Sequence, residues 1–313
     1  MIIQTEDLRR DYLVGTRLRR RRVTAVEDVT LDVEPGEAVG FLGPNGAGKS
    51  TTIKMLTGVL VPTAGRATVC GLDPVRERRE LAKRIGVVFG QRSQLWWDLP
   101  LADSFDLHAA IHRVPRARYR ERLDECVELL DMAGFLGTPV RQLSLGQRMR
   151  GEVTAALLHS PRLLVLDEPT IGLDLASKER LRSFLSAVNA RGDITLLLTT
   201  HDLPDVERLC RRVVVIDQGR VLVDDDLATL RRRFAGNRAL VVELAEPAPP
   251  LLGLDGVVDV TVEAQGLRQR LEFTAATTAA ELIAAVAQRV ELRDVAVDEP
   301  SIEDLVRTLY ARR

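Results

Sequence analysis

Residues 43–51 constrain the fold of this chain more than any other stretch, because they read Gly-Pro-Asn-Gly-Ala-Gly-Lys-Ser-Thr and fit the pattern G-x-x-x-x-G-K-[ST]. The apolar run Glu37–Leu42 before them predicts a strand, and Thr52–Leu60 after them predicts a helix. Such a loop turns successive backbone N–H groups toward an anion, and the helix presents its positive end to the same anion. We therefore predict a phosphate-binding loop made of Gly43, Pro44, Asn45, Gly46, Ala47, Gly48, Lys49, Ser50 and Thr51.

The alternative is a glycine-rich turn that does nothing but cap a helix. A cap needs one glycine, serine, aspartate or asparagine, not three glycines followed by Lys49 and Ser50. Only four of the 44 basic residues are Lys, so a Lys at this position is notable, and it suits a compact ammonium in a narrow loop. We expect Lys49 to reach the β- and γ-phosphates of a nucleotide and the Ser50 hydroxyl to bind Mg²⁺.

Length and composition indicate an ordinary globular protein of about two domains. The 313 residues carry a formal net charge of −1, which gives no general attraction to nucleic acid. Cys70, Cys126 and Cys210 are widely spaced and form no C-x-x-C pair, which predicts a reduced cytosolic environment. The start of the chain has no apolar signal region and no apolar run approaches the ~18 residues of a membrane helix. We expect another chain to supply any membrane span.

Residues 1–34 alternate apolar and polar side chains in short pieces, which predicts strands near Ile2–Thr5 and Val29–Val33. The basic cluster Arg17–Arg22 lies between them. We expect a solvated hairpin tip there, and contact with acidic lipid headgroups is the alternative. The ring of Tyr12 could stack on a nucleotide base or pack on the sheet, and the sequence leaves both interpretations open.

The pattern of the next two hundred residues predicts alternating strands and helices. Helical periodicity over residues 101–133, interrupted at Pro115, and a helix capped by Ser144 predict a helical lobe over about residues 92–160. Continuous apolar runs predict strands that are covered on both faces. The expected strands are Arg66–Cys70, Ile85–Phe89, Leu163–Leu166 and Ile194–Leu198, with Val213–Asp217 and Val221–Val223 on either side of a turn, and the other expected helices are Glu77–Arg84 and Ser177–Asn189.

The character of the sequence changes near Leu240, beyond which strands outnumber helices. We predict a main domain over residues 1–236 and a separate small α+β domain over residues 237–313. The small domain would be a regulatory ligand-binding module or an appendage that stabilises a dimer, and we assign no site residues to it. Its expected strands are Leu240–Leu244, Val257–Val262, Arg270–Phe273 and Arg293–Val297, and its expected helices are Ala279–Val290 and Ser301–Tyr310.

Polar residues follow three of the buried strands: the phosphate loop, Asp167-Glu168 and His201. Because ligands of an open α/β sheet bind beyond the carboxyl ends of its strands, we expect these residues to share one pocket. Asp167 would be the second Mg²⁺ ligand, directly or through water, and Glu168 would orient or deprotonate an attacking water. His201 would hydrogen-bond the γ-phosphate, although a histidine considered alone is more often structural.

The order of these motifs resembles that of the ATP-binding cassette (ABC) ATPases, and more closely that of the nucleotide-binding subunits of drug-resistance exporters. The similarity covers about residues 1–235. The matching motifs are Walker A at Gly43–Thr51, the Q-loop glutamine at Gln91, the LSGGQ signature at Leu143–Gln147, Walker B at Leu163–Glu168, the D-loop at Gly172–Asp174 and the switch histidine at His201. Two residues depart from the pattern: Gly90 is extra before Gln91, and Leu145 replaces the first signature glycine. We expect these departures to change the rate without abolishing function.

The resemblance implies a P-loop NTPase fold with a mostly parallel core sheet, an antiparallel β subdomain and a helical lobe. It also implies ATP and Mg²⁺ as ligands and hydrolysis of ATP to ADP and phosphate, coupled to transport. The implied catalytic residues are Lys49, Gln91, Glu168 and His201, and the implied metal ligands are Ser50, Gln91 and Asp167. Two copies would pair head-to-tail, so that each contacts the nucleotide of the other through Ser144, Gly146, Gln147 and Asp174.

The resemblance further implies a separate integral membrane permease that holds the homodimer at the cytoplasmic face of the membrane. We expect the permease to contact residues 91–100, where Trp96 and Trp97 are adjacent and cannot both point the same way in an extended segment. Packing of both rings inside the helical lobe is the alternative. A soluble ABC-type ATPase that acts on the ribosome or DNA is the competing function. One signature motif and the lack of a long heptad stretch favour transport, with no specific nucleic acid partner.

Overall fold

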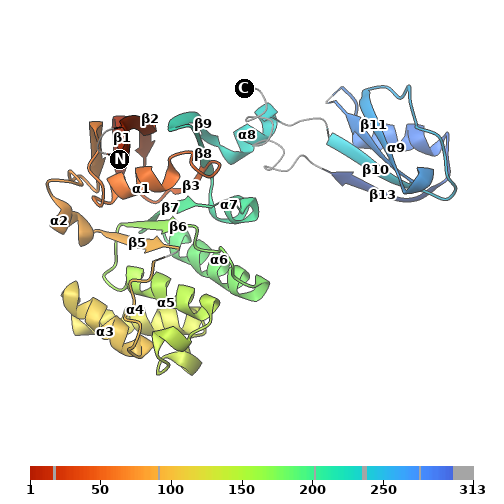
Figure 1. Cartoon of the computed structure of the whole chain (residues 1–313). Helices are drawn as coiled ribbons and strands as arrows, with labels where there is room; N and C mark the ends of the chain where they lie inside the picture. The colour runs from red at the N-terminus through yellow and green to blue at the C-terminus, as the bar shows by residue number, and fades with distance from the viewer. Residues whose placement is uncertain (17–18, 91, 201, 235–237, 275, 299–313) are drawn as a thin grey trace. The chain divides into compact units, whose positions relative to one another are not determined.

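The computed structural model describes residues 1–298 except 17–18, 91, 201, 235–237 and 275. The chain divides into two compact units, Met1–Leu227 and Ala228–Arg313 (Figure 1). Our domain limits of 1–236 and 237–313 stay a prediction. The expected helix Ser301–Tyr310 lies outside the described residues.

The first unit is built on a nine-stranded sheet of order β4-β1-β2-β9-β8-β3-β7-β6-β5. Its central strands are parallel, and β3, β7 and β6 are almost entirely buried because helices cover both faces, as their continuous apolar sequences predict. At the other end, β1 pairs antiparallel with β2 and β4, and β9 pairs antiparallel with β8, while β2 meets β9 in a short parallel contact. The expected fold class is confirmed. The parallel strands are β3 (Ala38–Leu42), β5 (Ile85–Phe89), β6 (Leu163–Asp167), β7 (Thr195–Thr199) and β8 (Arg212–Asp217), and the others are β1 (Ile3–Thr16), β2 (Arg19–Val33), β4 (Ala64–Val69) and β9 (Arg220–Asp226).

Helices cover this sheet and form a lobe beside it. The lobe consists of α3, α4 and α5, which Figure 1 shows at the end of the unit nearest β5. Among the described residues, no helix combines the length and the apolarity that crossing a membrane would require. The helices are α1 (Lys49–Leu56), α2 (Arg78–Ala82), α3 (Leu101–Ile111), α4 (Arg116–Leu129), α5 (Leu145–Leu157), α6 (Leu175–Ala190) and α7 (Leu203–Leu209).

The N-terminal hairpin differs most from the prediction. Strands were expected only near Ile2–Thr5 and Val29–Val33, whereas β1 and β2 run over 14 and 15 residues. The outer part of the hairpin carries polar and charged side chains on both faces, so it lacks the alternation that indicates a half-buried strand. Two predicted helices are shorter than expected: residues 57–60 lie beyond the end of α1, and α2 covers only the middle of Glu77–Arg84.

The second unit contains an antiparallel sheet of order β11-β12-β10-β13. One face of the sheet packs against α9, with Leu240, Val242, Leu271, Leu282 and Val286 in the core between them. Thr278 and Glu281 form a capping box that begins α9. Helix α8 (Leu227–Phe234) begins at the last residue of the first unit. The other elements are β10 (Arg238–Leu244), β11 (Val257–Glu263), β12 (Arg268–Phe273), α9 (Ala279–Ala287) and β13 (Leu292–Asp298).

Candidate active site

A cavity of about 960 Å³ lies beyond the carboxyl ends of β3, β5 and β6. Lys49 and Asp167 both line it, although 118 positions separate them in the sequence. The structure therefore brings together the glycine loop and the acidic pair that follows β6. The lining residues are Ala25, Gly43, Pro44, Asn45, Gly46, Gly48, Lys49, Ser50, Thr51, Lys54, Val59, Phe89, Gly90, Arg92, Asp167, Glu168 and Ile171.

The glycines of the loop allow close backbone approaches. A Cβ atom on Gly43 would lie 2.3 Å from the backbone oxygen of Ile216, and one on Gly48 would lie 2.6 Å from that of Ala25. Gly48 also has a φ of 107°, which disfavours any L side chain. Ala47 fills the inner side of the loop and is buried. The loop shape thus depends on the residue types that the motif specifies.

Lys49 is buried at the base of this loop, with 7% of its surface exposed. Its Nζ donates hydrogen bonds to the backbone oxygens of Gly43 at 2.5 Å and Pro44 at 3.1 Å. Burial lowers the pKa of Lys49, while the charges of Glu168 and Asp167 oppose that shift. A buried ammonium that lines a cavity between an anion-binding loop and two carboxylates is suited to a polyphosphate.

Ser50 and Asp167 place two oxygen atoms on the same side of the cavity. The Oγ of Ser50 lies 3.5 Å from Oδ1 of Asp167, and Thr199 donates its hydroxyl to that same Oδ1 at 2.5 Å. Mg²⁺ prefers hard oxygen ligands and is commonly held by one or two protein oxygens together with phosphates. This donor set fits Mg²⁺, with phosphate oxygens and water as the remaining ligands.

Glu168 has an unusual backbone conformation at the mouth of the cavity. Its φ is +56°, and its N–H donates to the backbone oxygen of Thr199 at 2.9 Å. A left-handed conformation costs a residue with a side chain about 1 kcal/mol, so the surrounding structure must impose it. The bond to Thr199 ties the end of β6 to the end of β7 and fixes where the Glu168 side chain begins.

The need for a glycine at position 90 is not apparent from the sequence. A Cβ atom at this position would lie 2.7 Å from the backbone oxygen of Asp167 and 2.9 Å from that of Glu168. Gly90 therefore lets the chain leaving β5 pass close to the acidic pair. Gln91 and His201, predicted to contact the metal and the γ-phosphate, lie outside the described residues.

A second missed residue is Asp205, which is completely buried on α7. Its carboxylate accepts hydrogen bonds from the hydroxyl of Thr170, from Nε of Arg182 at 2.5 Å and from the hydroxyl of Thr200 at 3.4 Å. One carboxylate thus joins the segment after β6, the segment after β7 and helix α6. The only sequence signal was its position beside Val206, at the start of a short helix with an apolar side.

The predicted signature residues lie away from this cavity. Ser144 caps α5: its Oγ accepts from the N–H of Gln147 at 3.2 Å, and the Gln147 side chain accepts from the N–H of Ser144 at 2.9 Å. Gly146 packs against the Ser177 side chain, and Asp174 caps α6 by accepting from the Ser177 N–H at 2.9 Å. The structure does not bring these residues to the phosphate loop of the same chain.

Tyr12 and Leu145 also lie outside the group that lines the cavity. The Tyr12 ring lies under the Arg10 guanidinium, with 4.9 Å between the Arg10 Cζ and the ring centroid. Leu145 is 37% exposed, and its side chain packs beside Gly172. Stacking of Tyr12 on a nucleotide base stays a prediction.

Comparison with known proteins gives matches over both units. The family "ABC transporter" matches residues 26–171, and the family "ATP-binding protein DrrA1-3-like, C-terminal domain" matches residues 226–307. The chain is 33% identical over 287 residues to the daunorubicin resistance ATP-binding protein DrrA3 of Streptomyces coeruleorubidus, covering 90% of this chain and 89% of that protein. It is 28% identical to the linearmycin resistance ATP-binding protein LnrL of Bacillus subtilis, covering 99% of each.

A solved structure matches this chain with a TM-score of 0.64 and 26% identity. It is a dimeric, post-hydrolysis state of an ATP-binding cassette bound to ADP and phosphate. The match covers 72% of this chain and 98% of the cassette.

Proposed function

The chain belongs to the ATP-binding proteins of ABC transporters, and we propose that it is the subunit that powers an exporter. As a member of this family it is an ATPase whose hydrolysis of ATP is coupled to transport. The observation that carries the exporter proposal is the extent of the similarity to DrrA3. The match spans 90% of the chain, and DrrA3 is named as a daunorubicin resistance protein.

We infer the roles of the site residues from the geometry of the cavity. Backbone N–H groups of residues 45–51 surround the phosphates, and Lys49 leaves its two carbonyl partners to bind the β- and γ-phosphates. Glu168 accepts a proton from the water that attacks the γ-phosphorus, and the bond to the β–γ bridging oxygen breaks, giving ADP and phosphate. The Thr199 backbone holds Glu168 in place for that transfer.

Ser50 and Asp167 are the residues that would hold Mg²⁺, which supplies charge neutralisation to the β- and γ-phosphates when bound. Thr199 fixes the Asp167 carboxylate through its hydroxyl, so one oxygen of Asp167 has a set position. The resemblance assigns Gln91 to the same metal and His201 to the γ-phosphate, and both assignments remain part of the proposal.

We propose that the active form is a head-to-tail homodimer. Ser144, Gly146, Gln147 and Asp174 lie away from the cavity of their own chain, so a second copy is needed to bring them to a nucleotide. The capping box occupies the N–H of Gln147, whereas the N–H groups of Leu145 and Gly146 have no partner among the described residues. These donors at a helix N-terminus suit the γ-phosphate held by the other copy. The dimeric cassette among the solved relatives supports this arrangement.

A separate membrane permease completes the proposal and would keep the dimer at the cytoplasmic face. Trp96 and Trp97 are 36% and 50% exposed, which supports contact with a partner and disagrees with packing of both rings inside the lobe. Trp97 also lies 5.6 Å below the guanidinium of Arg148, one residue past the signature. Binding of the permease at Trp97 would therefore act on α5, the helix that carries the signature.

Affinity purification of the tagged chain from detergent-solubilised membranes tests this function. We expect a multi-span membrane protein to co-purify and to raise the ATPase rate after reconstitution in lipid. Trp97→Ala should reduce recovery of that protein and leave basal ATP hydrolysis intact, whereas Leu129→Ala, at an exposed position of α4, should change neither. Recovery of ribosomes or DNA in place of a membrane protein would contradict the proposal.

A further inference from the structure

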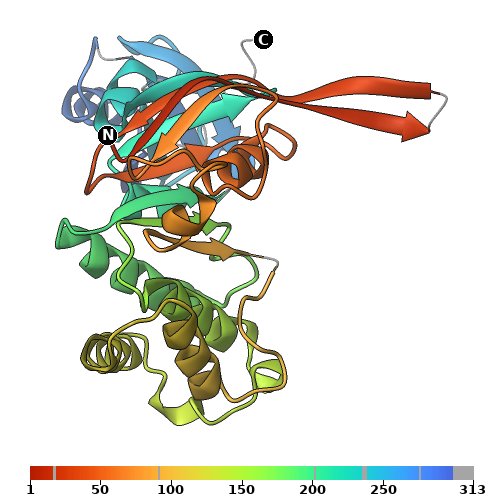
Figure 2. The same cartoon turned by 90° about the vertical axis from the view of Figure 1, so that its left-hand side faces the viewer.

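Strands β1 and β2 continue beyond the rest of the sheet as a two-stranded arm, which we define as residues 12–16 and 19–23. Pairing of β1 with β4 ends at Arg9, opposite Ala64, whereas pairing with β2 continues to Thr16, opposite Arg19. Figure 2 shows this hairpin projecting far from the body of its unit. An isolated two-stranded ribbon is only marginally stable in water, so an arm of this length is expected to have a partner.

The arm carries a concentrated positive charge. Residues 12–26 contain five arginines, at positions 17 and 19–22, and no Asp or Glu. Asp11, at the base of the arm, binds Arg9 at 3.1 Å and Arg22 at 2.5 Å. Hydrogen bonds from Arg9 and Thr24, with the charge of Arg22, lower the pKa of Asp11 to about 2, so this single carboxylate is ionised but is shared by two cations.

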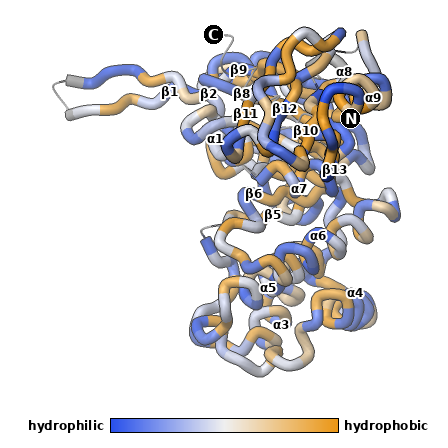
Figure 3. The backbone as a smooth tube through the Cα atoms, turned by 90° about the vertical axis from the view of Figure 1, so that its right-hand side faces the viewer, coloured by the Kyte–Doolittle hydropathy of each residue, from blue (hydrophilic) through white to orange (hydrophobic). Residues whose placement is uncertain are grey.

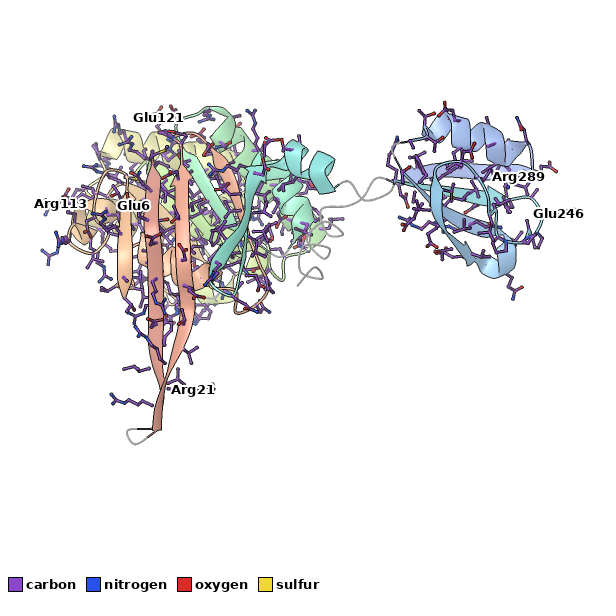
Figure 4. All side chains as sticks on the ribbon, turned by 90° about the horizontal axis from the view of Figure 1, so that it is seen from above. Glu6, Arg21, Arg113, Glu121, Glu246 and Arg289 are labelled. Atoms are coloured by element: carbon purple, nitrogen blue, oxygen red, sulfur yellow. The ribbon has the colours of Figure 1, made fainter. Side chains whose placement is uncertain are left out.

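Two arginines close to the end of the described arm, Arg20 and Arg21, are exposed. Arg20 and Arg21 have no ion-pair partner among the described residues. Figure 4 shows Arg21 near the end of the arm, and Figure 3 shows a hydrophilic stretch along one of its strands there. Their charge is therefore available to an external anion.

Aliphatic side chains accompany these arginines on both faces of the arm. Leu13 is 68% exposed and pairs with Arg22, and Val14 is 45% exposed and pairs with Arg21. Because paired residues of an antiparallel ribbon lie on the same face, each face presents one aliphatic group beside one guanidinium. Nothing in the described part of the chain covers these four side chains as a core would.

We propose that the arm binds the surface of an anionic membrane. Guanidinium groups bind headgroup phosphates and carboxylates, while aliphatic side chains enter the boundary between headgroups and acyl chains. Single-stranded nucleic acid is favoured less, because it is commonly held by aromatic stacking and the only aromatic ring of the arm, Tyr12, already lies against Arg10. The inference rests on the proposed function in one respect, namely that the protein works beside a membrane.

Flotation of the purified full-length chain with lipid vesicles tests the arm. Vesicles of phosphatidylcholine alone are compared with vesicles that contain 30% phosphatidylglycerol, as a chosen probe composition, at low and high salt. We expect binding to the anionic vesicles that falls as salt rises. Since each basic residue near such a surface contributes about 1 kcal/mol, Arg20→Glu/Arg21→Glu should weaken binding by at least ~30-fold. Leu13→Ser/Val14→Ser should weaken the binding to anionic vesicles that remains at high salt.

The matched control is Arg118→Glu/Arg120→Glu, which makes the same charge change at exposed positions of α4. Equal binding by the arm variant and this control would overturn the proposal, as would equal binding to neutral and anionic vesicles or binding to DNA alone. Retained ATP hydrolysis shows that each variant is folded. If the arm does not bind lipid, a permease can still co-purify with the chain. The two proposals can therefore fail independently.

A second measurement does not depend on removing the arginines. All three cysteines are buried, so Val14→Cys provides one accessible thiol for a polarity-sensitive dye. Anionic vesicles should shift the emission of the dye toward that of an apolar solvent. The same dye on Val258→Cys, a 55% exposed position of β11, serves as the control, and an identical shift at both positions would count against the arm.

Discussion

The N–H of Gly90 donates to the backbone oxygen of Asp167 at 2.8 Å, and this bond extends the pairing of β5 and β6 past the last strand residues. It places the segment that leads to Gln91 directly against the carboxylate pair of the site. The contact requires a residue without a side chain, since a Cβ on Gly90 would lie 2.7 Å from the same oxygen. The extra glycine thereby lets the backbone after β5 pass close to the two proposed site residues, Asp167 and Glu168.

Gly90→Ala should slow ATP hydrolysis more than it weakens ATP binding. The added methyl group must push Asp167 and Glu168 away from β5, and a displacement of about 1 Å at a reacting group can cost about 100-fold in rate. ATPase assays and binding of a fluorescent ATP analogue measure the two effects. Gly134→Ala is the control, because a Cβ there meets no atom within 4 Å. Equal rates for both variants would show that Gly90 does not position the site.

Glu168→Gln should reduce hydrolysis by about 100-fold or more and leave ATP binding intact. The amide keeps the size of the side chain and cannot take a proton from water, a function worth roughly 100- to 10,000-fold. Since the γ-phosphate then persists, the homodimer should persist as well, which light scattering after gel filtration with ATP can detect. Glu128→Gln, an exposed change on α4, should remain like the wild type. Normal turnover by Glu168→Gln would remove it as the base.

The sequence predicts those parts of the site that depend on residues close together in the chain. The glycine loop, the continuous apolar strand β6 and the acidic pair after it depend on neighbours in the chain, and strand ends converge by topology alone. The role of Gly90 and the burial of Asp205 depend on which strands and helices become neighbours, and no local pattern encodes that. The long hairpin was missed because its polar side chains on both faces carry no periodic signal.

Asp205→Asn should destabilise the first unit and slow hydrolysis. The change leaves the buried Arg182 without its main counter-ion, and breaking a buried pair costs about 3 kcal/mol or more. Urea unfolding measures the free energy, and kcat and KM measure the site. We expect kcat to fall with KM nearly unchanged, since Thr170, which donates to Asp205, lies two residues after Glu168. A role in stability alone would leave kcat of the folded fraction unaltered.

Arg182→Met/Asp205→Leu tests whether the loss comes from an unpaired charge. Removing both charges avoids a buried guanidinium without its partner, so the double variant should be more stable than Asp205→Asn. It should still have a low kcat, because Thr170 and Thr200 lose their acceptor. Full recovery of kcat in the double variant would mean that Asp205 does not position the segments beside the site.

The stability of the first unit should fall as the pH drops from about 6.5 to 4. His159 lies between the lobe and β5, its Nε2 is 2.9 Å from the Ile85 backbone oxygen, and its ring stacks on His112 at 4.0 Å. These two histidines line a small cavity together with Arg78. Burial, followed by the charge of His112, lowers the pKa of His159 to about 4. The folded protein therefore keeps this ring neutral in a range where it would be protonated if unfolded.

Between these pH values the unfolded chain binds more protons, so the free energy of unfolding decreases with falling pH and the loss levels off below about 4. Burial lowers the pKa of His108 and His112 in the same direction, and these rings add to the effect. Urea denaturation at pH 7, 6 and 5 measures the slope. In His159→Gln, which cannot titrate, the free energy should depend less steeply on pH than in the wild type, and an unchanged slope would assign the effect to other groups.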